Sequence, residues 1–201
     1  NASAGTTAAT QESKEATKEE TTVADTVVES VTGAIESMEE SGTEAPQAIR
    51  IFGPVTRTED GRLSIDNQSG VSNSGEIILN VSDEETYILD AVSGLPIKLE
   101  DIKDGDTIYA YIGPAMTMSL PPMTNAVMIF TNLPADAKAP DYVEVKSMVT
   151  DAGTSKSVLT AADGTEFTLA EDCNIFPYLT RNIVTLDDLT QGKKCVVWSD
   201  D

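Results

Sequence analysis

The sequence contains no histidine, the side chain that proteins use most often as a general base and as a transition-metal ligand. Most hydrolase triads and most zinc sites are therefore excluded. Serine and threonine are plentiful, but no base partner for a nucleophile can be identified from the spacing. We therefore predict a protein that is not an enzyme and that needs no cofactor.

Basic residues and long apolar runs are also scarce. The chain has 13 Lys and Arg against 34 Asp and Glu, a net charge of −21. Such a chain repels the phosphates of nucleic acids and anionic membrane surfaces, so we predict no nucleic-acid partner. No run of 18 or more apolar residues exists, so no segment is predicted to span a bilayer.

Residues 1–47 form an acidic, low-complexity leader in which Lys14 and Lys18 are the only basic residues. Its low apolar content predicts disorder. Apolar residues that recur every three or four positions predict a short helix over residues 23–40. The leader resembles the spacer that follows the lipid-anchored cysteine of bacterial surface lipoproteins. We therefore expect a targeting segment to have been removed and the protein to be extracytoplasmic, attached to the membrane only through a removed N-terminal lipid anchor.

From residue 48 the pattern changes to short runs of β-branched and aromatic residues between Gly, Pro, Asn and Asp, which predicts strands. The pattern then repeats at an offset of 87 residues, and apolar positions match as well as identities. Tyr111, for example, aligns with Trp198, which predicts a shared role in the core. The identical pairs are Glu84/Glu171, Ile88/Ile175, Leu99/Leu186, Asp101/Asp188 and Gly105/Gly192.

This repeat predicts an all-β protein with two tandem small β-barrel or OB-like modules, related by internal duplication, over residues 48–135 and 141–201. The second module lacks a counterpart of the last strand of the first, which we expect over residues 125–132. An open barrel leaves an unpaired strand edge, which folded proteins normally cover. The cover could be a longer natural chain, a segment lent by the leader, or another molecule pairing with the edge of the second module.

Several short phrases carry a resemblance to a known module. They are Leu79-Asn80-Val81, Thr86, Asp90, Gly94, Gly105-Asp106 and Met116-Thr117-x-Ser119-x-Pro121-Pro122. The chain resembles a repeated β-module of exported Gram-positive bacterial proteins, of the kind found beside copper amine oxidase N-terminal-like (stalk) domains. The resemblance covers residues 50–132, with 142–201 as a weaker second copy. It implies an extracytoplasmic β-module of no established activity.

A methionine- and proline-rich segment is the first candidate site. Thioether sulfur is a soft ligand suited to Cu(I), so Met116, Met118, Met123 and Met128 could handle that metal. Methionine also packs cores and forms adaptable binding surfaces without any metal. We favour a contact surface, for which the candidate residues are Met116, Met118, Pro121, Pro122 and Met123.

The two cysteines, Cys173 and Cys195, are the second candidate. In an exported protein they could form one disulfide, worth roughly 3 kcal/mol in the chain-entropy model. Cys195 also aligns with the apolar Ile108, so it could instead be an unbonded core residue. Both alternatives stay open.

These observations together predict a non-catalytic, extracytoplasmic module that binds or spaces something at the cell surface. Its expected partner is a surface polymer or a protein. Two alternatives remain: soft-metal handling through the methionines of residues 116–128, and an accessory domain of a surface enzyme.

Overall fold

The computed structural model describes residues 47–177 and 181–200. Its regular structure is β-strand apart from two 3-10 turns, which confirms the all-β prediction. No helix in these two ranges is long and apolar enough to cross a membrane. Residues 1–46 of the acidic leader, with the helix expected over residues 23–40, lie outside the described residues.

Six short strands occupy the first half of the described chain. Their connections turn at Gly61 and Gly75, whose φ angles of 85° and 86° favour glycine. The strands are β1 (Ile49–Arg57), β2 (Leu63–Asn67), β3 (Gly75–Asn80), β4 (Tyr87–Asp90), β5 (Thr107–Ile112) and β6 (Met123–Thr131).

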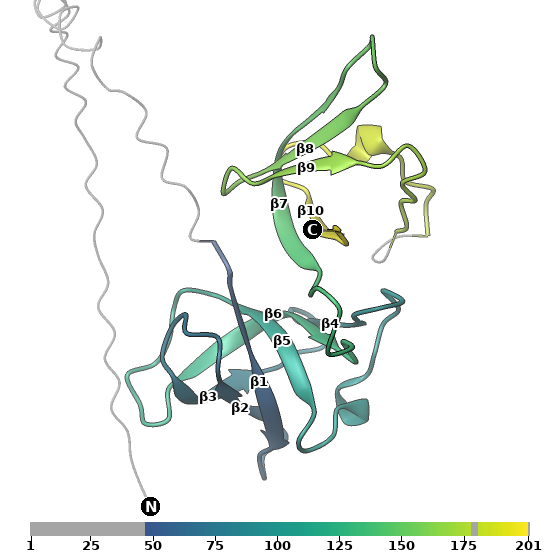
Figure 1. Ribbon diagram of the computed structural model, residues 1–201. Helices are drawn as coiled ribbons and strands as arrows, with labels where there is room; N and C mark the ends of the chain where they lie inside the picture. The colour runs from purple at the N-terminus through teal and green to yellow at the C-terminus, as the bar shows by residue number, and fades with distance from the viewer. Residues whose placement is uncertain (1–46, 178–180, 201) are drawn as a thin grey trace, which may run out of the picture. The chain divides into compact units, whose positions relative to one another are not determined.

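Five of these strands close into a barrel. Their order is β3-β2-β1-β5-β6, and β6 also pairs with β3, which brings the sheet back to its first strand (Figure 1). The pairs are antiparallel except β3 with β6, where Ile78 lies opposite Met123. Along the second half of β6, β4 takes the place of β3 as the parallel neighbour. This closed five-stranded barrel confirms the OB-like prediction for the first module.

The alternation of side chains along β6 separates two apolar clusters. Ile129 is fully buried in the main cluster with Ile51 of β1, Ile65 of β2 and Ile108 of β5. Its neighbours in sequence, Met128 and Phe130, belong to a second cluster with Leu89, Ala91 and Tyr111. Successive residues of a strand point to opposite faces, so β6 contributes to both clusters.

Glycine is required at one position inside β1. Gly53 lies opposite Ile108 of β5. A Cβ atom at Gly53 would lie only 1.8 Å from the backbone oxygen of Asp66 in β2. The backbones of β1 and β2 therefore approach each other here more closely than any side chain allows.

A second sheet follows, with strands β7 (Asp141–Thr150), β8 (Ser157–Ala161), β9 (Glu166–Leu169) and β10 (Lys194–Val197). Its order, β10-β7-β8-β9, repeats the order β5-β1-β2-β3 of the barrel. The 3-10 turns η1 (Leu99–Asp101) and η2 (Leu186–Asp188) precede β5 and β10 at the same offset of 87 residues. The two sheets therefore share one topology.

The turns before β5 and β10 are also held in the same way. The amide of Gly105 donates to the carbonyl oxygen of Val55 at 2.7 Å. The amide of Gly192 donates to the carbonyl oxygen of Val145 at 2.8 Å. Both glycines have positive φ, so the shared glycine of the repeat has a backbone role.

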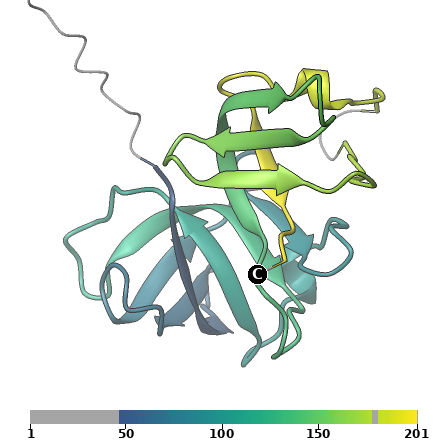
Figure 2. The same ribbon diagram turned by 45° about the horizontal axis from the view of Figure 1, so that its top comes forward.

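The second sheet is a curled half-barrel (Figure 2). Among the described residues, β10 pairs only with β7 and β9 pairs only with β8. In those ranges no strand follows β10 in the way that β6 follows β5. Within the described part of the chain, the outer edges of β10 and β9 therefore have no neighbouring strand.

Trp198 departs from the expected core role. Its side chain is 49% exposed, whereas its counterpart Tyr111 is buried. The indole N–H donates to the carbonyl oxygen of Ala91 at 2.6 Å, and the ring lies against Gly94, where an added Cβ would be 3.0 Å from it. Trp198 follows β10 and is thus directed to the turn after β4 rather than into its own sheet.

Cys173 and Cys195 are both free thiols, so the structure does not contain the disulfide that was one of the two expectations. Cys195 lies on β10, and Cys173 follows β9. These strands stand at opposite ends of the sheet order, so they are not the neighbouring strands that a disulfide would need. Burial raises the pKa of the Cys195 thiol to about 11.

Candidate functional site

The candidate contact segment forms the connection between β5 and β6, residues 113–122, called the β5–β6 loop below. The structure does not place its predicted residues on one surface. Met116 is half-buried and packs against the barrel core, and Pro122 is buried. Pro121 and Met123 are half-buried, and Met123 already belongs to β6. Of the five predicted residues, only Met118 is fully exposed.

Leu120 joins Met118 at the tip of the loop, although the sequence did not single it out. Its side chain is 97% exposed. Two large apolar side chains are therefore presented to solvent two residues apart. A signal existed in the sequence, because Leu120 directly precedes the Pro-Pro pair, which marks a loop.

Thr117 and Ser119 alternate with the exposed pair and brace the loop. The Thr117 hydroxyl accepts a hydrogen bond from the Met123 amide at 2.8 Å and pairs with the Ser119 hydroxyl at 2.6 Å. The Ser119 hydroxyl also donates to the carbonyl oxygen of Pro121 at 2.9 Å. The loop therefore has a fixed hydrogen-bonded frame, although Thr117 and Ser119, which form it, are themselves exposed.

The base of the loop is tied across its two sides. The Thr117 amide donates to the carbonyl oxygen of Met123 at 2.9 Å. The Thr124 hydroxyl donates to the carbonyl oxygen of Ala115 at 2.8 Å. The Ile78 amide of β3 donates to the carbonyl oxygen of Pro122 at 2.9 Å. Residues 118–121 therefore project from a base in which the two sides of the loop are hydrogen-bonded to each other and to β3.

The four methionines of the Cu(I) alternative are not brought together. Met128 is fully buried in the second apolar cluster, whereas Met116 packs against the main cluster on the other face of the sheet. The sulfur of Met123 lies 2.9 Å from a guanidinium nitrogen of Arg62. A soft cation is not expected beside that positive charge, so the placement does not support the metal alternative.

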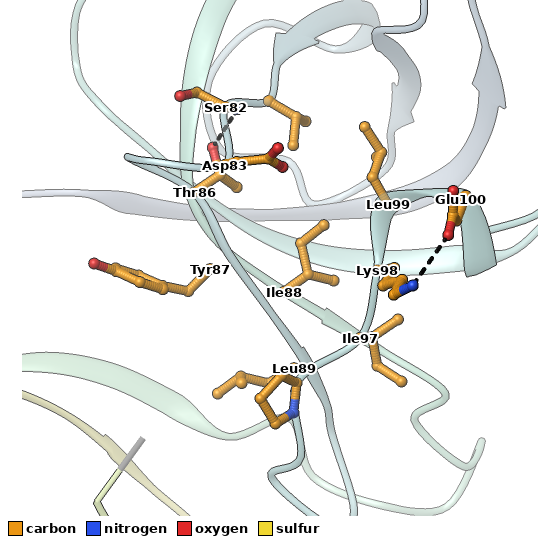
Figure 3. Close-up of a pocket in the computed structure, with 12 residues that line it drawn as sticks. Ser82, Asp83, Thr86, Tyr87, Ile88, Leu89, Ile97, Lys98, Leu99 and Glu100 are labelled. Carbon is orange, nitrogen blue, oxygen red and sulfur yellow. Dashed lines mark hydrogen bonds and ion pairs between the residues drawn. The ribbon is translucent and has the colours of Figure 1, made fainter. Parts of the chain in front are cut away.

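A cavity of about 470 Å³ lies beside β4, between the β3–β4 connection and residues 96–100 (Figure 3). Ile88, Ile97 and Leu99 give it apolar walls. Some of its polar groups are paired: the Thr86 hydroxyl donates to the carbonyl oxygen of Ala126, and Lys98 lies 3.5 Å from Glu100. In the described part of the chain, no buried side-chain polar atom lacks a hydrogen-bond partner. The cavity therefore shows no arrangement that assigns it a reaction.

The perturbed carboxylates have structural causes. Hydrogen bonds from Arg62 and Thr58 hold the pKa of Asp60 well below its usual range. The amide of Ser93, with the Asn132 side chain, lowers the pKa of Asp90. Each of these groups organises a turn or a local pair. None belongs to the β5–β6 loop, and none lines the cavity.

The chain has a distant bacterial relative. A protein of Brevibacillus choshinensis named "Protease inhibitor" is 28% identical over 95 residues, which cover 45% of this chain and 29% of the relative. The chain therefore spans less than a third of the length of that curated relative. No protein-family model matches the chain, and no solved structure matches it. The likeness to a module of exported Gram-positive proteins is supported only to this extent, as a distant and partial similarity to a bacterial protein.

Proposed function

We propose that this chain is a non-catalytic binding module that docks on a protease through the β5–β6 loop. The observation that carries the proposal is the exposure of Met118 and Leu120 on a loop that is braced by its own hydrogen bonds. The similarity to a protein named as a protease inhibitor supports the choice of partner.

The exposed side chains of the loop suit the specificity pocket of a protease. Serine proteases place one side chain of the bound chain in such a pocket. Met118 or Leu120 can fill a large apolar pocket without being withdrawn from a core, because both are exposed already. The bracing hydroxyls of Thr117 and Ser119 reduce the entropy lost on binding, since the loop is ordered beforehand.

The hydrogen bonds at the base of the loop also explain how the loop would resist proteolysis. The bonds between Thr117 and Met123 and between Thr124 and Ala115 join the two sides of the loop outside the exposed pair. If a protease cut the chain near Met118 or Leu120, both new ends would stay held in place. Resynthesis of the bond would then compete with release, which favours inhibition over turnover.

The test is inhibition of serine proteases that prefer large apolar residues, of the chymotrypsin and subtilisin types. Met118→Asp and Leu120→Asp are compared with Val92→Asp, a matched control at a 63% exposed apolar residue of another turn. A side chain that anchors an interface contributes at least about 2 kcal/mol, so the variant that removes it should inhibit about 30-fold less well.

The control should inhibit as the wild type does, and the wild-type chain should remain intact by mass after incubation. The proposal fails if neither protease type is inhibited at micromolar chain. It also fails if Val92→Asp weakens inhibition as much as the two loop variants do.

We further propose that the protein acts outside the cytoplasm, tethered at the cell surface. The Thr-, Ser-, Ala- and Glu-rich composition of residues 1–47 supports this, because such spacers follow lipid anchors in bacterial surface proteins. Treatment of intact cells with an added broad-specificity protease should remove the protein, while a cytoplasmic marker survives. Survival of both would contradict the surface location.

A further inference from the structure

The cavity beside β4 has one wall made by the β3–β4 connection, which is held in a tight turn. The Thr86 amide donates to the carbonyl oxygen of Ser82 at 2.8 Å, and the Ser82 amide donates to the Thr86 hydroxyl at 3.1 Å. The Glu84 amide donates to the Ser82 hydroxyl at 3.2 Å. Asp83 lies between these bonded residues, so the backbone that carries its side chain is fixed.

The opposite wall, residues 96–100, is also fixed to the barrel. The Ile97 amide donates to the carbonyl oxygen of Ile88 in β4 at 2.9 Å. The guanidinium of Arg57, at the end of β1, donates to the carbonyl oxygen of Leu99 at 2.6 Å. Both walls are therefore in place before anything binds, and a preformed site loses less entropy on binding.

The walls present apolar side chains that the barrel core covers only in part. Val81, Ile97 and Leu99 are half-buried and pack against the main cluster, while Ile88 is buried. All four line the cavity, whose volume of about 470 Å³ lies within the usual range for ligand sites, about 300–1,000 Å³. An apolar group placed there would remove these surfaces from water.

The cavity also carries one carboxylate that the fold does not use. Its charged lining residues are Asp83, Lys98 and Glu100, and Lys98 lies 3.5 Å from Glu100. Asp83 makes no hydrogen bond or ion pair through its side chain with any residue that the structure describes. At the repeat offset of 87 it aligns with Ala170, so the repeated turn does not require a carboxylate here.

In Figure 3 the Asp83 carboxylate points toward the side of the cavity that Leu99 lines, whereas Lys98 is directed to Glu100. The lining therefore combines an apolar floor with a single unpaired negative charge at an exposed position. A ligand complementary to this lining has a compact apolar group and one positive charge.

We propose that the cavity binds a small organic amine. Its apolar group lies between Ile88, Ile97 and Leu99, and its ammonium group pairs with Asp83. Anions are repelled by Asp83 and by the net charge of −21. The chain's own acidic leader, which has only two lysines, is a poor occupant for the same reason. No residue of the β5–β6 loop lines the cavity, so the proposal does not depend on protease binding.

The probe is phenethylamine, titrated into the full chain with ¹³C-labelled methyl groups. The methyl signals of Ile88, Ile97 and Leu99 should shift, and those of Leu159 in the second sheet should not. A ligand of this size is expected to half-saturate the site at about 1 mM.

Two compounds separate the apolar and the charged contributions. Phenethyl alcohol has nearly the same shape without the charge, and it should bind about fivefold more weakly, because an exposed ion pair contributes up to about that factor. Ethylamine has the charge without the ring, and it should not shift the cavity signals in the same range of concentration.

A matched pair of variants tests the carboxylate itself. Asp83→Asn should weaken phenethylamine about fivefold and leave phenethyl alcohol unchanged. Glu84→Gln removes the same charge from the neighbouring residue, which is exposed and does not line the cavity, so it should leave both affinities unchanged. The amine and alcohol affinities of the wild type keep the test valid if either variant does not fold.

Any of four results would overturn the proposal. The cavity signals could fail to shift with phenethylamine at about 20 mM, far above the expected half-saturation. The alcohol could bind as tightly as the amine, which would leave the charge without a role. Asp83→Asn could bind the amine as the wild type does. Glu84→Gln could weaken the amine as much as Asp83→Asn does, which would assign the effect to overall charge rather than to a contact.

Discussion

Replacing Gly53 by alanine tests the close approach of β1 and β2. The new methyl group would lie 1.8 Å from the Asp66 oxygen, and real contacts of this kind are not shorter than 3.0 Å, so the backbones must separate by about 1.2 Å. That movement lengthens the bond from the Gln68 amide to the Phe52 oxygen, now 2.9 Å, at a cost of about 1 kcal/mol. Strain in the repacked core adds about 1–3 kcal/mol.

The expected loss is therefore about 2–4 kcal/mol, of which the lower entropy of the unfolded variant offsets less than about 1 kcal/mol. Urea unfolding followed by circular dichroism measures it, and the midpoint should fall by roughly 1 M or more. Gly113→Ala is the matched control, because an added Cβ there meets no atom within 4 Å. It should stay within about 0.5 kcal/mol of the wild type. A Gly53→Ala variant as stable as the wild type, with an unchanged slope, would refute the reasoning.

Three further predictions concern the loop, a turn and a thiol. Thr117→Val removes the hydroxyl that holds the Met123 amide, so protease inhibition should weaken about tenfold while the free energy of unfolding falls by no more than about 1 kcal/mol, whereas Thr117→Ser should behave as the wild type does. The Asp90 carboxylate has a lowered pKa chiefly because the Ser93 amide donates to it, so its ionised form stabilises the fold. That stability is present above the unfolded pKa of about 3.9 and is lost as the pH falls below it. Asp90→Asn should therefore flatten the dependence of unfolding free energy on pH below about pH 4, and an unchanged slope would contradict this. Alkylation of Cys195 should accelerate about tenfold per pH unit until about pH 11, because burial raises the pKa of this thiol; a plateau below pH 9 would contradict that burial.

The fold was largely predictable because residues shared by the two repeats, such as glycines with positive φ, determine the same backbone conformation in both. Gly105 and Gly192 share positive φ and equivalent amide bonds, so the shared phrase predicts the same turn before β5 and β10. The parallel pairing of β3 with β6 was not predictable in the same way. It joins residues such as Ile78 and Met123, which are distant in sequence, and no local pattern specifies such a register.

The candidate contact segment stays a prediction, and the sequence did not indicate which of its side chains reach the solvent. Sequence spacing located residues 116–123, yet the direction of each side chain depends on hydrogen bonds such as Thr117 to Met123, which fold the loop back on itself. Met116 consequently faces the core while Met118 faces solvent. Trp198 was mispredicted for a related reason: its partner, the carbonyl oxygen of Ala91, belongs to the turn after β4 in the first module, and an alignment of the two repeats cannot reveal a contact made between them.

The position of Trp198 makes its fluorescence a probe of one site in the protein. It is the chain's single tryptophan, and its indole rests on Gly94 with its N–H bound to the Ala91 oxygen. Intrinsic emission excited at the red edge of the absorption band therefore comes from one place, where the end of the second sheet meets the turn after β4. Loss of the contact between Trp198 and the turn after β4 would change this fluorescence even if both sheets stayed folded. Fluorescence therefore distinguishes separation of the two sheets from their unfolding.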